Sequence, residues 1–376
     1  MSQPGIKILT VVGARPQFVK AAMVSRAIVL HNREASGRPI VQEILHTGQH
    51  YDRAMSQVFF DELGIPDPAV NLAVGSGPHG ETTARMLEGI EREILARKPD
   101  WLLVYGDTNS TLAGALAAAK LHVPLAHVEA GLRSFNKNMP EEVNRVLTDH
   151  VSSLLFCPTQ AAVQNLANEG ITEGVHHVGD VMYDAAIAFG EIARNRSSIL
   201  EQLGLKPKGY YLATVHRAEN TDDRQRLAGI LDGLNRLANG IPVILPLHPR
   251  TGNCIKAYGL EEIAGGLRLI EPVSLLDMVR LEQGARLILT DSGGVQKEAC
   301  FHGVPCVTLR EETEWVETVA AGWNQVVGHR PEGIVAAAAA ATPSGRIREY
   351  GDGNASGKIL GQMLRQDLRC WHVTQP

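Results

Sequence analysis

The apolar residues of this chain recur in short continuous runs, each followed by glycine or polar residues. In chain order the runs are KILTVVG (7–13), EILHTG (43–48), WLLVYG (101–106), PLAHVEAG (124–131), YLATVH (211–216), PVILPLH (242–248), LRLI (267–270), RLILTDSGG (286–294) and PCVTLR (305–310). Runs of this kind are typical of strands buried on both faces, as in a parallel sheet.

Helical patterns separate the apolar runs. In the segment 81–98 one helical face carries Met86, Leu87, Ile90, Ile94 and Leu95, and the charged residues fall on the other face. Strand–helix alternation on both sides of the middle predicts two doubly wound parallel-sheet α/β domains. Ligands of such sheets bind at the carboxyl ends of the strands. The polar residues that follow each apolar run are therefore the candidate site residues.

We expect the first domain to cover residues 1–182 and the second to cover residues 183–357, with the hinge near Gly179 to Asp184. The C-terminal segment, about 358–376, predicts a lone helix that packs back onto the first domain. A length of 376 residues is ample for two such domains.

Composition narrows the class of protein. Hydrophobic residues make up 44% of the chain and charged residues 20%, as in soluble globular proteins. The net charge of −5 argues against a nucleic-acid partner. No apolar run approaches the ~18 residues of a membrane span, and the N-terminus lacks the pattern of a secretory signal.

Cysteine and histidine usage bears on compartment and cofactors. The five cysteines are an odd number without C-x-x-C spacing, which indicates reduced thiols in a cytoplasmic protein. The fourteen histidines show no zinc-binding spacing, so we expect no metal site. Without a G-x-G-x-x-G motif, a nicotinamide cofactor is not indicated either.

The stretch HVEAGLRSFNKNMPEEVNR (127–145) gathers titratable residues directly after an apolar run. Glu129 lies at the predicted strand end, a position that core packing explains poorly. Glu141 and Glu142 follow a proline and begin a helix, where acidic residues are favourable without any catalytic role. Asp107 follows another strand end, and its alternative role is that of a helix N-cap.

Two segments predict anion or nucleotide binding. In VVGARPQFVK (11–20), Arg15 and Lys20 lie at a strand–helix turn that favours anions, which indicates phosphate binding; the alternative is an ordinary turn with two solvated cations. In TDSGGVQKEA (290–299), a diphosphate would bind the Ser292 hydroxyl and the helix N-terminal amides beyond Gly293 and Gly294. Glu298, one turn further on, would accept the ribose hydroxyls. The alternative for this segment is a capped glycine-rich loop.

Other strand ends carry further candidates. ATVHRAEN (213–220) contains His216, and LPLHPRT (245–251) contains His248 near an arginine. EPVSLLDM (271–278), with Pro272, would hold a flat base by backbone contacts or is simply a loop. HTGQHYD (46–52) completes the set of strand ends.

Taken together, these motifs resemble the non-hydrolysing UDP-N-acetylglucosamine 2-epimerase family over nearly the whole chain. The resemblance rests on GARPQFVK, TGQHYD, VYGDT, HVEAGLRS, MPEEVNR, ATVHRAEN and TDSGGVQKEA in this order. It implies two Rossmann-like domains in a glycosyltransferase-B-like arrangement with the active site in the interdomain cleft. It also implies a homodimer, no cofactor, and a UDP-sugar substrate that serves surface polysaccharide synthesis.

The resemblance also implies residue roles. The matching catalytic positions are Asp107, Glu129, Glu141, His216 and Arg145. The matching UDP-binding positions are Arg15, Lys20, His216, Ser292, Gly293, Gly294 and Glu298. The chain departs from the best-known members of the family at two motifs: it has GARPQF where they have GTRPE, and TEWVE where they have TERPE. Both variants resemble the subgroup that acts on UDP-2,3-diacetamido-2,3-dideoxyglucuronate. That substrate would require a cation for its C6 carboxylate, for which Arg310 and Arg250 are candidates.

The expected reaction converts UDP-N-acetylglucosamine to UDP-N-acetylmannosamine. Departure of UDP makes C1 cation-like and the C2 proton acidic, so a carboxylate can remove that proton to give a 2-acetamidoglucal. Reprotonation on the other face and return of UDP complete the epimerisation, with cationic groups and amides stabilising the departing diphosphate. The alternatives are a UDP-dependent glycosyltransferase, a hydrolysing epimerase and a non-enzymatic UDP-sugar sensor.

Overall fold

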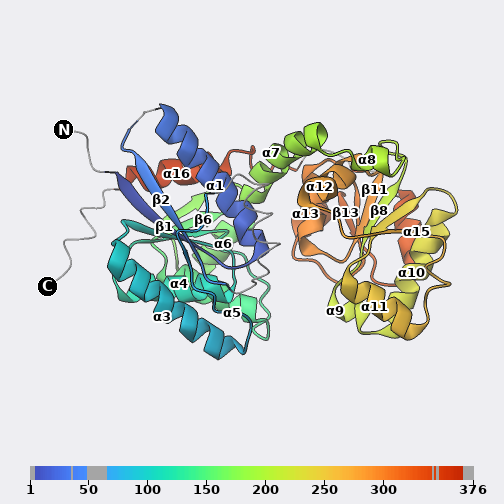
Figure 1. Ribbon diagram of the computed structural model, residues 1–376, viewed down its shortest axis with the longest axis horizontal. Helices are drawn as coiled ribbons and strands as arrows, with labels where there is room; N and C mark the ends of the chain where they lie inside the picture. Colours follow the sequence, from blue (N-terminus) through green and yellow to red (C-terminus); the bar gives the residue numbers. More distant parts are fainter. Residues whose placement is uncertain (1–4, 35–36, 49–65, 341–342, 344–346, 367–376) are drawn as a thin grey trace. The chain divides into compact units, whose positions relative to one another are not determined.

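The computed structural model describes residues 5–34, 37–48, 66–340, 343 and 347–366. It divides into two compact units, Met1–Ala185 with Glu349–Pro376 (unit 1) and Ala186–Arg348 (unit 2). Two predicted features lie partly outside the described residues. These are the HTGQHYD motif, at residues 49–52, and the C-terminal segment, at residues 367–376. Each unit contains a parallel sheet with helices on both faces (Figure 1), which confirms the predicted fold class.

The described strands of unit 1 form a parallel sheet in the order β3-β2-β1-β4-β5-β6-β7. Their bounds are β1 Ile6–Val12, β2 Ile40–His46, β3 Val70–Asn71, β4 Trp101–Tyr105, β5 Leu125–Val128, β6 Leu154–Cys157 and β7 Val175–His177. The helices are α1 Arg15–Glu34, α3 His79–Arg97, α4 Asn109–Lys120, α5 Pro140–Val151, α6 Gln160–Asn168, α16 Ala355–Arg365 and the first part of α7 Val181–Arg196.

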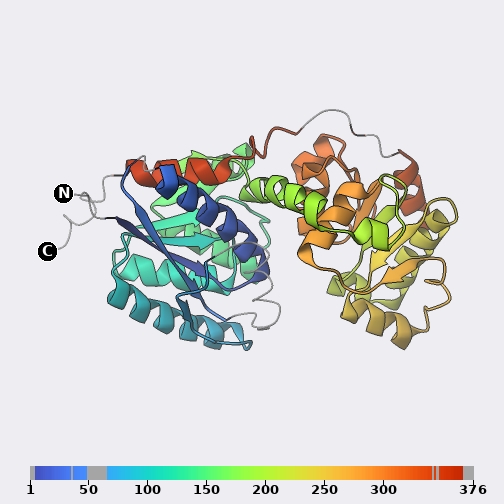
Figure 2. The same ribbon diagram turned by 45° about the horizontal axis from the view of Figure 1, so that its top comes forward.

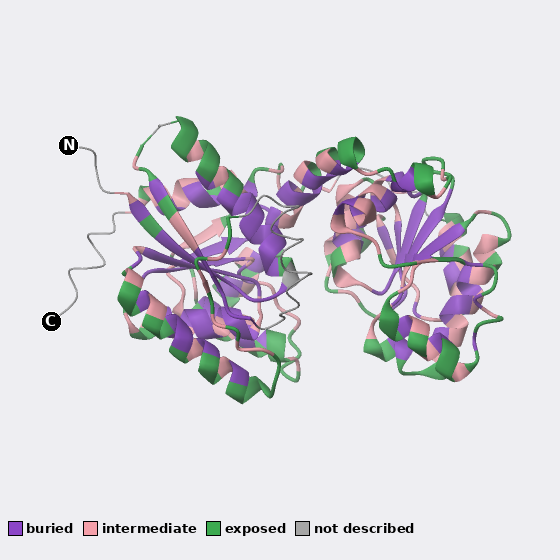
Figure 3. Ribbon diagram, in the orientation of Figure 1, coloured by how far each residue is buried: buried purple, intermediate pink, exposed green. Residues whose placement is uncertain are grey.

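Helices cover both faces of the unit 1 sheet, and its central strands β4, β5 and β6 are buried along their whole length. All residues of β4 are buried, as the purple strands in Figure 3 illustrate. On one face α3 packs against α4 and α4 against α5, while α1 and α16 pack together on the other face (Figures 1 and 2). Along α3, Met86, Ile90 and Ile94 are buried as predicted, but Leu95 is 58% exposed. The buried stripe of α3 is therefore narrower than the sequence pattern indicated.

The described strands of unit 2 form a second parallel sheet in the order β10-β9-β8-β11-β12-β13. The strands are β8 Tyr211–Thr214, β9 Val243–Pro246, β10 Arg268–Ile270, β11 Leu287–Thr290, β12 Cys306–Thr308 and β13 Asn324–Val326. The helices are α8 Ile199–Gln202, α9 Ala218–Thr221, α10 Arg224–Ala238, α11 Pro249–Tyr258, α12 Leu275–Gly284, α13 Gly293–Phe301, α14 Val316–Ala320 and α15 Pro331–Ala340.

Two separate apolar cores hold the helices of unit 2 onto its sheet. One core joins residues of α10, α11 and α15 to one face of the strands, and the other joins α8, α12 and α13 to the opposite face. Leu234 and Leu281 are fully buried representatives of the two cores. Both faces are thus covered, as the continuous apolar runs predicted.

The chain passes from unit 1 to unit 2 after Ala185, and it returns at Glu349 rather than at the expected 357/358 boundary. The return is earlier because the segment before α16 already pairs with unit 1. The Asp180 amide donates to the Tyr350 carbonyl at 2.9 Å. The terminal helix itself begins at Ala355 and packs on α1.

Candidate active site

The strand order of unit 1 reverses between β1 and β4, and the carboxyl ends of these strands carry predicted site residues. Strands β2 and β3 lie on one side of this point, and β5, β6 and β7 lie on the other. Tyr105 of β4 pairs with Val128 of β5, so Gly106–Asp107 comes to lie beside Glu129. Crevices at such reversal points are where open α/β sheets bind ligands.

Glu129 follows β5 in a backbone conformation that few side chains adopt, with φ of +73°. Its Oε2 forms an ion pair with Nζ of Lys20 on α1, and the two side chains are only 13% and 9% exposed. A Cβ at Gly106 would lie 3.3 Å from Glu129 Oε2, so glycine keeps this position open around the carboxylate. Lys20 thus contacts the candidate catalytic carboxylate, whereas the sequence predicted a role for it in UDP binding.

Asp107 forms an ion pair with Nη2 of Arg145 on α5, which joins two predicted catalytic residues. The N-cap of α4 is Thr108, whose hydroxyl accepts from the Thr111 amide at 3.3 Å. The alternative role of Asp107 as an N-cap is therefore excluded. Burial raises the pKa of Asp107, Glu129 raises it further, and Arg145 and Lys20 oppose both effects. Asp107 can consequently hold a proton at a higher pH than an ordinary aspartate.

The two acidic residues at the start of α5 have different surroundings. Glu142 is 3% exposed and accepts hydrogen bonds from the Ser134 amide and hydroxyl and from the Phe135 amide, all at 2.9 Å. Burial alone would raise the pKa of Glu142, but these bonds and Arg145 lower it. Glu141 is exposed, and its side chain makes no hydrogen bond or ion pair with the described residues. Glu142 therefore anchors the preceding loop, while Glu141 is free to meet a ligand.

The turns after β1 and β4 are joined by Gln17, which the sequence interpretation did not single out. Its Oε1 accepts from the Gly13 and Ala14 amides at 2.8 and 3.0 Å. Its Nε2 donates to the Tyr105 carbonyl at 2.8 Å. Gln17 replaces the glutamate of the better-known GTRPE motif, and its amide both accepts and donates here, whereas an ionised glutamate could only accept. Arg15, the predicted anion ligand, is the first residue of α1.

Unit 2 repeats this arrangement, because its strand order reverses between β8 and β11. Asp291 follows β11, is fully buried, and accepts from the His216 and Arg217 amides after β8 at 3.0 Å. His216 Nδ1 lies 3.3 Å from the same carboxylate. Burial lowers the pKa of His216, His248 and Arg217 add to this, and Asp291 opposes it. The ring is thus held at the strand ends with a reduced tendency to carry charge.

The segment after Asp291 forms the expected helix N-terminus. Ser292 is the N-cap of α13, and its hydroxyl accepts from the Val295 amide at 3.5 Å. An ideal Cβ on Gly294 would approach nothing closer than 3.9 Å, so the backbone there is accessible to a ligand. Beside it, Trp315 Nε1 donates to the Gly293 carbonyl at 2.8 Å. Glu298 lies in the second turn of α13 and is half-buried.

The remaining predicted binding residues are distributed over unit 2. His248 is the N-cap of α11, and its ring centroid lies 5.8 Å from that of His216. Pro272 is exposed in the segment between β10 and α12. The two candidate cations for a sugar carboxylate already have partners. Arg310 binds Glu314 through both terminal nitrogens at 3.0 and 3.1 Å, and Arg250 binds Asp222 at 2.5 and 2.6 Å.

The sequence interpretation did not assign roles to Asp291, Arg217 and Asp149. Asp291 was visible as the acidic residue before Ser292, and Arg217 as the residue after His216. Arg217 Nη2 would lie 3.7 Å from a Cβ at Gly293, beside the N-terminus of α13. For Asp149 the one indication in the sequence is that it lies four residues after Arg145 on the same helix.

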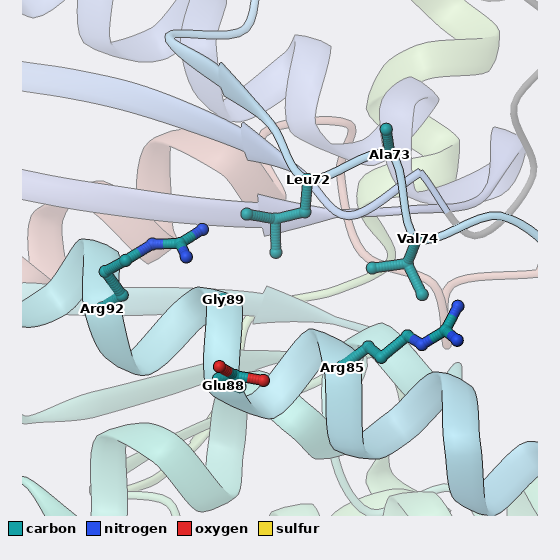
Figure 4. Close-up of a pocket in the computed structure, with 7 residues that line it drawn as sticks. All are labelled: Leu72, Ala73, Val74, Arg85, Glu88, Gly89 and Arg92. Carbon is teal, nitrogen blue, oxygen red and sulfur yellow. The ribbon is translucent and has the colours of Figure 1, made fainter.

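Within the described ranges, no helix is both long and apolar enough to span a membrane. The same residues contain no group of histidine, cysteine or acidic side chains arranged to hold a metal ion. A surface hollow of about 210 Å³ lies between the segment after β3 and α3 (Figure 4). It is lined by Leu72, Ala73, Val74, Arg85, Glu88, Gly89 and Arg92. None of the strand-end residues described above lines this hollow.

Comparison with known proteins gives a consistent result. The family model described as UDP-N-acetylglucosamine 2-epimerase matches residues 33–364. A Methanococcus maripaludis protein named UDP-N-acetylglucosamine 2-epimerase homolog is 52% identical, over 96% of this chain and 99% of its own. The UDP-2,3-diacetamido-2,3-dideoxy-D-glucuronate 2-epimerase of Pseudomonas aeruginosa is 51% identical, over 96% of this chain and 100% of its own.

A solved structure is similar over the same extent. The crystal structure of Methanocaldococcus jannaschii UDP-GlcNAc 2-epimerase in complex with UDP-GlcNAc and UDP matches with a TM-score of 0.84 and 42% identity. The match covers 96% of this chain and 100% of that one.

Proposed function

Because the chain belongs to the UDP-N-acetylglucosamine 2-epimerase family, we propose that it inverts C2 of a UDP-2-acetamido sugar without hydrolysing it. The first substrate to test is UDP-N-acetylglucosamine, with UDP-N-acetylmannosamine as product. The observation that carries the proposal is the pair of carboxylates at the ends of β4 and β5. Asp107 and Glu129 are each ion-paired with a different cation, Arg145 and Lys20.

The proposed reaction begins with cleavage of the C1–O bond, whose electron pair leaves with UDP. The amides at the start of α13, Ser292 and His216 are the proposed groups that stabilise the charge developing on the diphosphate. Glu298 is the proposed ligand of the ribose hydroxyls. These assignments are supported by the position of all three side chains at or just after the strand reversal of unit 2.

The second step is proton transfer at C2. Once C1 is electron-poor, a carboxylate removes the C2 proton and leaves the neutral 2-acetamidoglucal. A proton delivered to the opposite face, followed by return of UDP to C1, gives the epimer, so no water is consumed and the C2 hydrogen is the one atom exchanged. We assign proton transfer to Asp107, Glu129 and Glu141, because Asp107 has a raised pKa and Glu141 is exposed.

A second candidate substrate is UDP-2,3-diacetamido-2,3-dideoxyglucuronate. It is favoured by the Pseudomonas aeruginosa relative of that name and by the Gln17 and Trp315 departures from the usual motifs. Arg310 and Arg250 would have to exchange their acidic partners to bind its carboxylate. Arg217, beside the N-terminus of α13, is the alternative cation.

Proton NMR in heavy water tests the proposal with each of the two nucleotides. Deuterium incorporated at C2 together with a manno-configured product supports epimerisation, and the nucleotide that turns over identifies the substrate. Release of UDP with free sugar would instead indicate a hydrolysing enzyme. If UDP binds but neither nucleotide exchanges its C2 proton, the proposal is wrong, and a glycosyltransferase or a sensor becomes the better account.

We also propose that the protein acts as a homodimer in the cytoplasm and supplies a sugar for a surface polysaccharide. The cytoplasmic assignment is supported by the four cysteines of the described chain, which form no disulfide. Light scattering during gel filtration measures the oligomeric state, and a monomer at micromolar concentration would contradict this part of the proposal.

A further inference from the structure

A cluster of four ionisable side chains, three of them buried, lies next to the Asp107–Glu129 site in unit 1. It consists of His127 on β5, Asp149 on α5, Arg133 after β5 and Glu169 after α6. His127 Nδ1 lies 2.7 Å from Asp149 Oδ1, and Arg133 donates at 2.7 Å to both Asp149 and Glu169. The side chains of His127, Asp149 and Arg133 are at most 1% exposed.

The hydrogen-bond partners of Asp149 define its charge. Besides facing His127, it accepts from Arg133 Nη1 at 2.7 Å and from the Gly131 amide at 3.1 Å. Burial alone would raise the pKa of Asp149, but His127 and Arg133 together lower it. Oδ2 of Asp149 thus accepts from two N–H groups, which favours the ionised form, and an ionised carboxylate can only accept hydrogen bonds.

The other ring nitrogen of His127 also faces an acceptor. Nε2 lies 2.7 Å from the Gly106 carbonyl oxygen, which has no proton to donate. A neutral imidazole has one N–H and one lone pair, so it would leave one of these two short contacts repulsive. Only the doubly protonated ring donates to both Asp149 and Gly106.

The cluster contacts the backbone that carries both candidate catalytic carboxylates. His127 holds the carbonyl of Gly106, the residue before Asp107, and it lies two residues before Glu129. Asp149 holds the Gly131 amide, two residues after Glu129. Because Glu129 has a φ of +73°, a left-handed conformation that is strained for a non-glycine residue, contacts on both sides of it help to maintain the turn.

We propose that His127 is a permanently doubly protonated positioning residue that, with Asp149 and Arg133, holds the Asp107 and Glu129 turns in register. It does not contact substrate and exchanges no proton during the reaction. Its charge fixes the Gly106 carbonyl on one side and the Asp149 carboxylate on the other. This role rests on the proposed function where kinetics are measured. The protonation state of His127 can be measured whatever reaction the protein catalyses.

Nitrogen-15 NMR of the histidine-labelled full-length protein at pH 7.5 measures the protonation state directly. The His127 signals are those missing from the spectrum of His127→Gln. If that variant does not fold, they are assigned by through-bond correlations in the wild-type protein. Both ring nitrogens are expected to carry slowly exchanging protons. A single protonated nitrogen at pH 7.5 would overturn the inference, whatever reaction the protein catalyses.

Kinetics of His127→Gln then test positioning. Gln keeps an amide donor but not the charge, and a displacement of about 1 Å at the carboxylates predicts a fall of about a hundredfold in kcat. KM and UDP affinity should stay within about threefold, because UDP is proposed to bind residues of unit 2. His150→Gln changes an exposed residue of α5 whose Nε2 lies 3.5 Å from Glu169; it is the matched control and should retain wild-type kcat.

The outcomes separate the two proposals. Wild-type kcat in His127→Gln, or an equal fall in kcat and UDP affinity, would contradict a positioning role. Absence of C2 exchange in the wild-type protein would reject the proposed function but leave the NMR result standing. If His127→Gln does not fold, Asp149→Asn supplies the same comparison, with loss of one His127 ring proton expected in the NMR spectrum.

Discussion

At the scale of single residues, the two carboxylates at the ends of β4 and β5 differ in their environments. Glu129 is nearly enclosed and paired with Lys20, whereas 32% of the Asp107 side chain is accessible and Arg145 is its partner. Burial and the nearby Glu129 raise the pKa of Asp107. A pair of neighbouring carboxylates, of which Asp107 has a raised pKa, suits a reaction that removes a proton and returns one.

Replacing Glu129 by Gln should abolish C2 exchange and leave UDP affinity within a few-fold of wild type. The amide keeps the shape of the side chain but cannot accept the C2 proton. Glu298→Ala should show the reverse pattern, with weaker UDP binding. Deuterium incorporation and calorimetric titration with UDP measure the two effects.

The matched control is Glu91→Gln, an exposed glutamate on α3 that should change neither quantity. Wild-type turnover in Glu129→Gln would remove this residue from the proposed catalytic set.

Glu142→Gln should lower the free energy of unfolding at pH 7 by about 1–3 kcal/mol, the usual worth of hydrogen bonds to a charged group. The pKa of Glu142 is lower in the folded protein than its ordinary value of 4.5. Its contribution is therefore complete above pH 4.5 and is lost as the pH falls through the folded-state pKa. The difference between wild type and variant should shrink below pH 4.5.

Urea denaturation at several pH values measures this difference. Glu141→Gln, the exposed neighbour, should unfold like the wild type at every pH. A gap between wild type and Glu142→Gln that persists unchanged at the lowest pH would contradict the assignment of Glu142 as an ionised anchor.

At the scale of secondary-structure elements, each unit places its polar residues at the carboxyl ends of two adjacent parallel strands, at the point where the strand order reverses. In unit 1 this point lies between β1 and β4, and in unit 2 it lies between β8 and β11. Gln17 joins the two turns in unit 1, and Asp291 joins them in unit 2. A buried polar group thus fixes the spacing of the two loops at each reversal point.

Gln17→Glu should destabilise unit 1 by about 1–3 kcal/mol, because a carboxylate oxygen would replace the amide donor facing the Tyr105 carbonyl. Gln42→Glu is a matched control. Gln42 Nε2 donates to the Thr10 hydroxyl at 2.9 Å, and a hydroxyl can reverse its role and donate to the new carboxylate.

Thermal unfolding of the two variants measures the difference. An equal loss of stability in Gln17→Glu and Gln42→Glu would show that the direction of the Gln17 hydrogen bonds is unimportant.

At the scale of the whole molecule, the chain leaves unit 1 and returns to it at neighbouring positions. The turns at Gly179 and Gly351 are packed so closely that a Cβ on Gly179 would lie 2.8 Å from the Tyr350 carbonyl oxygen. Asp184 on α7 accepts from the Ala355 amide at 2.9 Å and from the Ser356 amide and hydroxyl at 2.7 Å. Asp184 therefore serves as the N-terminal cap of α16 from another helix.

Asp184→Ala should weaken α16 by about 1–2 kcal/mol, the range found for loss of an N-cap. Faster hydrogen exchange is expected over Ala355–Arg365, while peptides of the unit 2 sheet and UDP affinity should be unchanged. Asp352→Ala, which removes an exposed carboxylate close to the same helix, is the control. Equal exchange of α16 in wild type and Asp184→Ala would contradict the capping role.

The sequence by itself determined the fold class and most of the strands, because a strand buried on both faces must be apolar along its length. Short strands with mixed burial, such as β3 and β13, lacked this signal. The sequence pattern also did not show how narrow the buried stripe of α3 is. The sequence also determined which strand ends carry polar residues, since Asp107, Glu129, His216 and Ser292 each follow an apolar run.

Only the tertiary structure decided which of these residues meet. Hydrogen bonds and ion pairs join residues far apart in the chain, such as Lys20 with Glu129 and Asp107 with Arg145, and sequence spacing does not encode those distances. For the same reason, Glu142 and Glu141 look alike in sequence but differ in burial. The charge of His127 likewise follows from its two acceptors, which come from separate elements and meet only in the folded protein.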